Sequence, residues 1–286
     1  MQTTDPQTAK SDLLATRYPL PATSARSVAT FNPLHLGDNL VTLHFLRALA
    51  KANPQTYFYH YAPDQYLAQL YPIWQDLPNL AVCSIALVPQ GAHNTWCGSG
   101  GWWYGQPDTT DWLATYTRWL DHLAAQMGLA NPLRKPTDFL FDYPALQRVA
   151  EPIAFHGVKR ILVINSPPQS NQASGYSLEA FDTLIRQLDA AGHAVITTHP
   201  SMVDDIPCTQ ARGLDVTAIG RLSQTAEAIV GVSTGPMWTT FNIWNRDSVK
   251  LRLFLCDRER VDMLPTVVSA NSLSLFPEIL KDHGLI

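Results

Sequence analysis

The sequence has few charged residues and no long uninterrupted apolar run. Charged residues make up 15% of the 286 residues, and 20 Lys and Arg stand against 24 Asp and Glu, for a formal net charge of -4. A general nucleic-acid-binding surface needs clustered positive charge, so this balance excludes nucleic acid as a broad partner. No stretch approaches the ~18 continuous apolar residues of a membrane span, and the N-terminus lacks the basic-then-apolar order of a secretory signal. We therefore expect a cytoplasmic protein.

The chain also has little that would hold a metal or form a disulfide framework. Its four cysteines, Cys83, Cys97, Cys208 and Cys256, form no Cys-x-x-Cys pair, and none has a histidine at zinc-site spacing. Disulfide frameworks are unusual in chains of this length, so we expect reduced thiols. No Asp-x-Asp motif is present, and nothing else in the sequence calls for a divalent ion. We expect no metal and no bound cofactor.

Strand-like and helix-like segments alternate along most of the chain, which predicts an α/β fold. Residues 1–26 read as a polar tail containing proline and serine. Strands are predicted at 27–31, 57–61 and 80–88 and helices at 40–50 and 64–74, and after a proline-rich stretch at 132–152 the pattern restarts with strands at 161–164, 193–197, 229–232 and 251–255 and helices at 178–188, 222–228 and 236–244. This order is typical of parallel sheets with crossover helices.

The restart predicts two Rossmann-like, doubly wound domains that face each other across a cleft. We place an N-terminal domain at 27–150 and a C-terminal domain at 151–286. The all-apolar run at 161–164 is typical of a central parallel strand. Ligands of such sheets bind beyond the carboxyl ends of the strands, so we searched the strand-to-helix junctions for chemistry.

The strongest local signal is the junction Val232-Ser233-Thr234-Gly235-Pro236. Ser233 or Thr234 can cap the following helix, Gly235 lets the backbone approach a ligand, and Pro236 suits a first helical turn. Free N–H groups at such a junction favour a phosphate. From the local residues alone, an ordinary well-capped helix is the better interpretation.

The second signal is the turn His35-Leu36-Gly37-Asp38-Asn39, which follows the first strand. An aspartate at a helix start is commonly a cap, and taken alone that interpretation is the better one. The functional alternative makes Asp38 a general base that removes a proton from an attacking hydroxyl. His35 is a competing candidate for the base.

Taken together, the two signals are more specific. The Gly37-Asp38 turn before an amphipathic helix, and the later segment 222–237, resemble the bacterial ADP-heptose:lipopolysaccharide heptosyltransferases. The resemblance implies a GT-B fold with an acceptor-binding N-terminal domain and a nucleotide-sugar-binding C-terminal domain. It also implies inverting, metal-independent sugar transfer, with Asp38 at the position of the catalytic aspartate. The donor would lie against Ser233, Thr234, Gly235, Pro236 and Met237, and the acceptor near Gly37 and Asn39.

The chain departs from that family's pattern at the donor segment. The family usually reads Asp-Ser/Thr-Gly-Pro-Met-His there, whereas this chain has Ser233 in place of the aspartate and Trp238 in place of the histidine. The family's lysine before the first helix of the second domain is also missing from residues 171–177. These departures argue for a nucleotide-sugar other than ADP-heptose. Further donor contacts are predicted at Ser174, Arg221 and, at the end of a second-domain strand, His199.

A glycine- and tryptophan-rich loop at 89–107 interrupts the first domain. Loops of this length in compact domains usually have a function. Trp96, Trp102, Trp103 and Tyr104 lie in this loop, where their rings can stack on the apolar faces of sugars and cover an acceptor. Packing at a domain interface or against a partner chain explains them equally well. Trp112 and Trp119 lie on a predicted helix and are expected to pack.

The sequence therefore predicts an inverting, metal-independent glycosyltransferase that moves a sugar from a nucleotide-sugar donor to a glycan or glycoconjugate acceptor. The nucleotide-sugar is a co-substrate, and a lipid-linked acceptor would bring the protein to a membrane surface. Two alternatives stay open: a nucleotide-sugar epimerase of the same architecture, and a non-catalytic protein that binds nucleotide-sugars or glycans.

Overall fold

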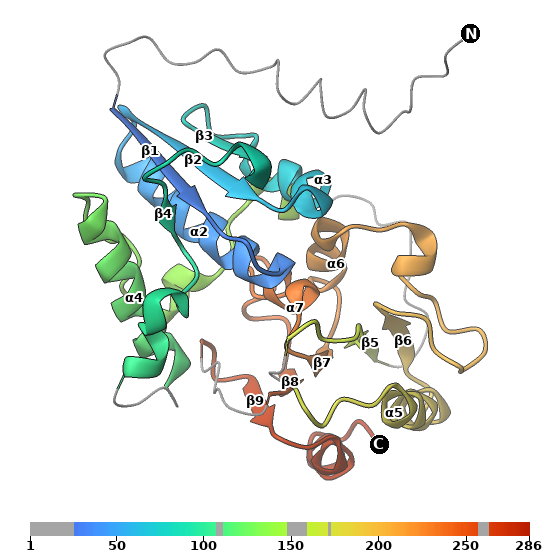
Figure 1. The fold of residues 1–286 in the computed structure, drawn as a ribbon. Helices are drawn as coiled ribbons and strands as arrows, with labels where there is room; N and C mark the ends of the chain where they lie inside the picture. Colours follow the sequence, from blue (N-terminus) through green and yellow to red (C-terminus); the bar gives the residue numbers. More distant parts are fainter. Residues whose placement is uncertain (1–25, 107–110, 148–158, 171–172, 257–262) are drawn as a thin grey trace, which may run out of the picture.

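Two separate parallel sheets, one from each half of the chain, form the frame of the molecule (Figure 1). The computed structural model describes residues 26–106, 111–147, 159–170, 173–256 and 263–286. Apart from Arg26, the predicted tail lies outside these residues, as does the predicted division between the domains at residues 150 and 151. The first sheet has the order β3-β2-β1-β4 and the second β6-β5-β7-β8-β9. Their strands are β1 (Arg26–Phe31), β2 (Thr56–Ala62), β3 (Leu80–Ser84), β4 (His93–Asn94), β5 (Arg160–Ile164), β6 (Ala194–Thr197), β7 (Ala228–Val232), β8 (Leu251–Leu255) and β9 (Val267–Ala270).

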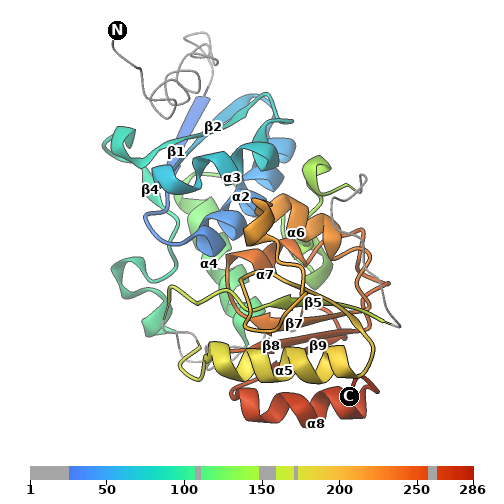
Figure 2. The same ribbon diagram turned by 90° about the vertical axis from the view of Figure 1, so that its right-hand side faces the viewer.

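Most of the helices lie between and below the sheets, and α4 lies to one side of them (Figures 1 and 2). Helices α2 and α3 lie under the first sheet, α6 and α7 come next, and α5 and α8 lie on the far side of the second sheet (Figure 2). The helices are α2 (Leu36–Ala52), α3 (Asp64–Trp74), α4 (Trp112–Gln126), α5 (Leu178–Ala190), α6 (Val216–Leu222), α7 (Gly235–Thr239) and α8 (Phe276–Asp282). Within the described residues, none of them has both the length and the apolar character needed to cross a bilayer.

The burial of the strands follows from their sequence patterns. Every second residue of β2, from Thr56 to Ala62, is buried, because that face rests on α2. In β5, all residues from Ile161 to Ile164 are buried, which confirms the prediction of a central parallel strand covered on both faces.

The two halves share one apolar core. A single cluster of buried side chains includes Leu40 of α2, Ile219 of α6 and Met237 of α7, so it continues from one half into the other. Backbone hydrogen bonds reinforce the contact, because Phe141 N–H donates to Phe241 O at 2.8 Å. A second cluster fills the space between the second sheet and α5 and α8. An apolar interface of this kind holds the halves in a fixed relation.

Several boundaries differ from the sequence-based expectation. The third strand ends at Ser84 and continues as a 3-10 turn. The prediction of a helix at 222–228 is wrong. Helix α6 spans Val216–Leu222, because the Asp215 side chain accepts the Ala218 N–H and caps the helix there, and Ala228 already belongs to β7. Helix α7 ends at Thr239, well before Trp244. The Thr239 and Thr240 hydroxyls donate to carbonyls of the preceding turn, a local bond that competes with helix continuation.

Candidate active site

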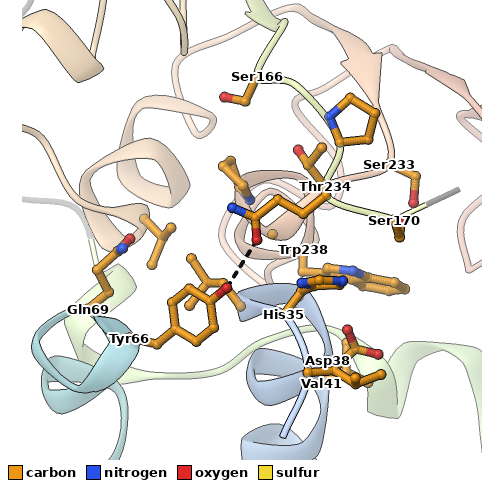
Figure 3. Close-up of a pocket in the computed structure, with 18 of the residues that line it drawn as sticks. His35, Asp38, Val41, Tyr66, Gln69, Ser166, Ser170, Ser233, Thr234 and Trp238 are labelled. Carbon is orange, nitrogen blue, oxygen red and sulfur yellow. Dashed lines mark hydrogen bonds between the residues drawn. The ribbon is translucent and has the colours of Figure 1, made fainter. Parts of the chain in front are cut away.

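A pocket of about 1230 Å³, here called the central pocket, is lined by residues of both halves. The first half contributes the turn before α2, part of α3, the tryptophan-rich loop and the start of α4. The second half contributes the loops after β5, β6 and β7 and the start of α6 (Figure 3). The pocket thus lies beyond the carboxyl ends of strands from both sheets, which is where parallel sheets usually bind ligands.

Asp38 lies in the first turn of α2 and faces the central pocket. Its carboxylate lies beside the indole of Trp238, with His35 close by (Figure 3). Burial raises the pKa of the Asp38 carboxyl above its ordinary value of 3.8, although His35 and the backbone N–H groups of Asp38 and His35 oppose the shift. The carboxyl is therefore both bonded to the helix start and more basic than an ordinary aspartate. The N-cap of α2 is His35, and no side-chain cap is present, so Asp38 is not the cap that its position in the sequence suggested.

A chain of fully buried polar side chains holds the turn that carries Asp38. The Asn39 side-chain amide donates to Leu34 O at 3.3 Å and to His35 O at 3.0 Å. Its oxygen Oδ1 accepts from Nε2 of His60 at 2.9 Å, and Nδ1 of His60 lies 3.1 Å from the Thr30 hydroxyl. Burial lowers the pKa of His60 to about 3, so the ring is neutral at neutral pH and donates from Nε2.

A second buried branch fixes the same turn from the other side. Asn32 accepts the Leu34 N–H at 3.0 Å, and its amide donates to the Thr42 hydroxyl at 3.3 Å. Thr42 in turn lies 3.2 Å from the Thr95 hydroxyl and is hydrogen-bonded to Tyr116, which lines the pocket. Buried polar groups stabilise a structure only when they are fully paired, so this network specifies one conformation for the turn.

The loop between β7 and α7 meets the Asp38 turn directly. Ser233, Thr234, Gly235 and Pro236 all line the central pocket. A Cβ at Gly235 would lie 3.2 Å from Gly37 N and 3.2 Å from Leu36 Cβ, so only glycine fits here without displacing a neighbour. Thr234 donates its hydroxyl to Val232 O at 3.4 Å and makes no side-chain cap. The two motifs singled out in the sequence are thus in contact, about 200 residues apart in the chain.

Some residues predicted for the site lie elsewhere. The Asn39 side chain points into the network, and Met237 is fully buried in the core. Arg221 donates to Ala145 O at 3.0 Å, so it joins the two halves and is absent from the pocket lining. Ser174 does not line the pocket either, and Trp102 packs on Trp119 with ring centroids 5.1 Å apart. His199 does line the pocket, where its Nδ1 lies 2.7 Å from Gln210 Oε1.

Aromatic rings line the central pocket more extensively than the sequence indicates. Trp96, Trp103 and Tyr104 line it as the sequence analysis suggested, and further rings come from Tyr66, Trp112, Tyr116 and Trp238. Trp112 was expected only to pack, and it does both, because its ring stacks on Tyr116 at 4.7 Å and contacts Trp238 at 5.0 Å. A stacked pair on one helical turn is visible in the sequence as Trp112 and Tyr116, four residues apart. The contact with Trp238 depends on the tertiary fold.

One hydrogen bond crosses the pocket. The Tyr66 hydroxyl of α3 donates to Gln169 Oε1, in the loop after β5, at 3.0 Å (Figure 3).

Charge is sparse in the central pocket. Among the described residues that line it, none is Lys or Arg, and the two acids are Asp38 and Asp215, of which Asp215 caps α6. Across the described ranges, no group of three or more His, Cys, Asp or Glu is placed to hold a metal ion. Anionic groups of a ligand would therefore be bound here by hydroxyls, amides and backbone N–H groups.

Comparisons with known proteins identify the fold. No family model and no curated protein sequence matches the chain. Solved structures match it at low identity. The ADP-heptose lps heptosyltransferase II of E. coli is 14% identical, with a TM-score of 0.54 over 90% of this chain and 98% of that chain. The glycosyl transferase family 9 structure from Veillonella parvula is 11% identical, with a TM-score of 0.51 over 91% and 89%.

An E. coli heptosyltransferase solved with ADP-2-deoxy-2-fluoro heptose is also similar, at 11% identity and a TM-score of 0.54 over 90% of this chain and 99% of that chain. The likeness spans almost the whole of each chain and both sheets. At these identities it establishes that the chain has a heptosyltransferase-like α/β fold.

Proposed function

We propose that this protein is a glycosyltransferase that transfers a sugar from a nucleotide-sugar to a glycan or glycoconjugate acceptor. The observation that carries the proposal is the contact between the Asp38 turn and the β7–α7 loop at one pocket. The heptosyltransferase-like fold, found over 90% of the chain, supports the same assignment. A GT-B arrangement, in which the two halves bind acceptor and donor on either side of the pocket, belongs to this proposal, as do a cytoplasmic location and recruitment to a membrane by a lipid-linked acceptor.

In the proposed reaction, Asp38 accepts the proton of an acceptor hydroxyl. The acceptor oxygen attacks the anomeric carbon of the donor from the face opposite the nucleotide, the bond to the diphosphate oxygen breaks, and the nucleoside diphosphate leaves with the electron pair. This single displacement inverts the anomeric configuration. The raised pKa of Asp38 favours the role, because a more basic carboxylate removes a proton more readily. His35 is the alternative base and lies in the same turn.

The leaving diphosphate would be bound by neutral groups. Ser233, Thr234 and the backbone at Gly235 lie on one side of the pocket, and Ser166 and Ser170 lie in the facing loop after β5. Preorganised hydroxyls and N–H groups in a largely buried site can stabilise developing negative charge. We propose that transfer proceeds by this means without a metal ion.

A non-catalytic nucleotide-sugar or glycan-binding protein is the second candidate. The absence of Lys and Arg from the described pocket lining favours it, because a transferase must stabilise the charge that leaves with the nucleotide. For an epimerase, extra acid–base carboxylates should line the donor site. Beside Asp38, the described part of the lining contains one further acid, Asp215, and it caps a helix.

The test is a panel of nucleotide-sugars with a mixed glycan acceptor, in which release of the nucleoside diphosphate is followed with and without EDTA. We expect one donor to support release that is insensitive to EDTA. Asp38→Asn should lower the rate by about 10²–10⁴-fold, the usual contribution of a general base. Asp204→Asn changes an exposed carboxylate outside the pocket and is the matched control.

Each alternative has its own result in the same assay. Donor binding without turnover would favour a binding protein, and interconversion of the donor without an acceptor would favour an epimerase. Full activity in Asp38→Asn would refute the mechanism.

A further inference from the structure

Three aromatic side chains of the central pocket, here called the aromatic stack, pack on one another beside the Asp38 turn: Tyr116, Trp112 and Trp238. The rings of Tyr116 and Trp112 lie 4.7 Å apart at an angle of 9°, and Trp112 meets Trp238 at 5.0 Å. The first two come from α4 and the third from α7, so the stack joins the two halves. Tyr116 and Trp112 are each 6% exposed, and Trp238 is half-buried. Close packing of this kind makes the stack a fixed part of the pocket wall.

Trp238 lies directly on the turn that carries Asp38. A Cβ at Gly37 would be 3.2 Å from both Cδ1 and Nε1 of the indole, so the ring comes this close because residue 37 has no side chain. The indole lies beside the Asp38 carboxyl (Figure 3). At the other end of the stack, burial and, to a lesser degree, the charges of Cys97 and Asp38 raise the pKa of Tyr116 well above 10.0. The carboxyl therefore lies against Trp238 and within electrostatic range of Tyr116.

Burial is the cause that makes Asp38 more basic. It is the largest effect on the pKa of this carboxyl and raises it, whereas the charge of His35 and the backbone N–H groups of Asp38 and His35 lower it. The charged form of a carboxyl loses hydration beside apolar side chains, so the residues that keep water from Asp38 set its basicity. The other titratable groups in the described lining are Tyr66, Cys97, Tyr104, Tyr116, His199 and Asp215.

We propose that Trp238 is a positioning residue for Asp38: its indole shields the carboxylate from water and leaves it directed at the acceptor hydroxyl. The inference rests on the proposed function for the acceptor, and on the packing of the aromatic stack for the shield. A carboxylate that is held in one place and has lost part of its hydration removes a proton more readily. The indole exchanges no proton with the substrate, so its effect passes through Asp38.

The test compares Trp238→Gln, which places a polar side chain beside the carboxyl, with Trp238→Phe, which keeps an apolar ring. The Asp38 titration is followed in the full-length protein by carbon-13 NMR with labelled aspartate, in the absence of any ligand. In Trp238→Gln we expect the pKa of Asp38 to fall toward its ordinary value of 3.8, because water reaches the carboxylate. Trp238→Phe should keep most of the wild-type pKa. Trp238→Ala opens the same space without adding a polar group and should give the same fall, so the result does not depend on one variant folding.

Kinetics provide the second readout, with the donor and acceptor that the wild-type protein uses. The acid limb of kcat/KM should move to lower pH in Trp238→Gln together with the pKa of Asp38, and it should stay near the wild-type position in Trp238→Phe. At neutral pH, kcat of Trp238→Gln should fall by less than the about 10²–10⁴-fold expected for loss of a general base, because the carboxylate is still present.

The matched control is Trp244→Gln. Trp244 is also half-buried and packs on the same apolar core, but it does not line the pocket. This variant should lower Tm and leave the pKa of Asp38 unchanged. A wild-type pKa of Asp38 in folded Trp238→Gln or Trp238→Ala, or an equal shift in Trp244→Gln, would overturn the inference. The proposed function fails separately. A pKa that falls as expected, in a protein that releases no nucleoside diphosphate, would refute the transferase and leave the shield standing.

Discussion

His60 provides a quantitative test of the network under the Asp38 turn. In His60→Leu, Asn39 Oδ1 loses the donor that lies 2.9 Å away and is left buried without a partner. The Thr30 hydroxyl keeps an acceptor, because Tyr59 O lies 3.3 Å from it. One orphaned buried acceptor costs roughly 1–3 kcal/mol. In a chain of this size that loss lowers Tm by roughly 2–12 °C.

The pH dependence of this loss is more diagnostic than its size. Burial lowers the pKa of His60 from 6.5 to about 3, so below pH 6.5 the unfolded chain takes up a proton that the folded protein does not. The free energy of unfolding of the wild-type protein therefore falls by up to about 1.4 kcal/mol per pH unit on acidification. His60→Leu has no imidazole at this position and does not show this decrease. Starting from a deficit of about 2 kcal/mol, the variant should match the wild type near about pH 5.

The assay is urea unfolding of both proteins at several pH values, together with steady-state kinetics at neutral pH. We expect kcat to fall and KM to change little, because the network positions Asp38 and does not touch a ligand. His193→Leu is the control, since this buried histidine bonds Leu285 O at 2.8 Å on the far side of the second sheet. It should lose stability and keep kcat. A deficit for His60→Leu that is constant with pH would refute the reasoning.

Three further predictions concern the same pocket. Burial raises the pKa of the Asp38 carboxyl, so the ionised carboxylate destabilises the fold once the pH rises through that pKa. Thermal melts of Asp38→Asn should therefore show a higher Tm than the wild type at neutral pH and no gain in Tm in acid. Gly235→Ala should impair turnover because its Cβ would press on the Asp38 turn, whereas at Gly175 the nearest atom to a Cβ lies 3.7 Å away and Gly175→Ala should be active. Tyr66→Phe removes the 3.0 Å bond across the pocket and should cost about 1 kcal/mol or less in urea unfolding while raising KM.

Local signals were sufficient for much of the fold. For the two motifs of the site, the local residues alone favoured ordinary helix caps, and the resemblance to a known family singled the motifs out. A strand that is covered on both faces needs apolar residues throughout, and a strand covered on one face needs them at every second position. The sequences of β5 and β2 show these two patterns, so the burial of each strand could be predicted. The Asp38 turn and the glycine at 235 each follow the carboxyl end of a strand, so the parallel topology predicts each at the edge of its own sheet. The contact between them depends on the packing of the two halves.

What the sequence could not supply depends on contacts between distant residues. Arg221 was predicted from the sequence as a donor contact, yet its guanidinium donates to Ala145 O, which the packing of the halves brings within reach. The bond between Asn39 and His60 joins positions 21 residues apart and has no sequence signature. At the end of helix α7, the hydroxyls of Thr239 and Thr240 donate to backbone carbonyls of the preceding turn. The spacing of apolar residues does not predict such bonds, so the end of this helix could not be predicted from the sequence.

The most direct test concerns the proton that Asp38 is proposed to accept. The acid limb of kcat/KM for sugar transfer should be measured beside the titration of the Asp38 carboxyl, followed by carbon-13 NMR of aspartate-labelled protein and identified by its loss in Asp38→Asn. We predict that activity falls on acidification at the midpoint of that titration, above the ordinary value of 3.8. An acid limb at a different pH, or an unchanged profile in Asp38→Asn, would contradict the assignment.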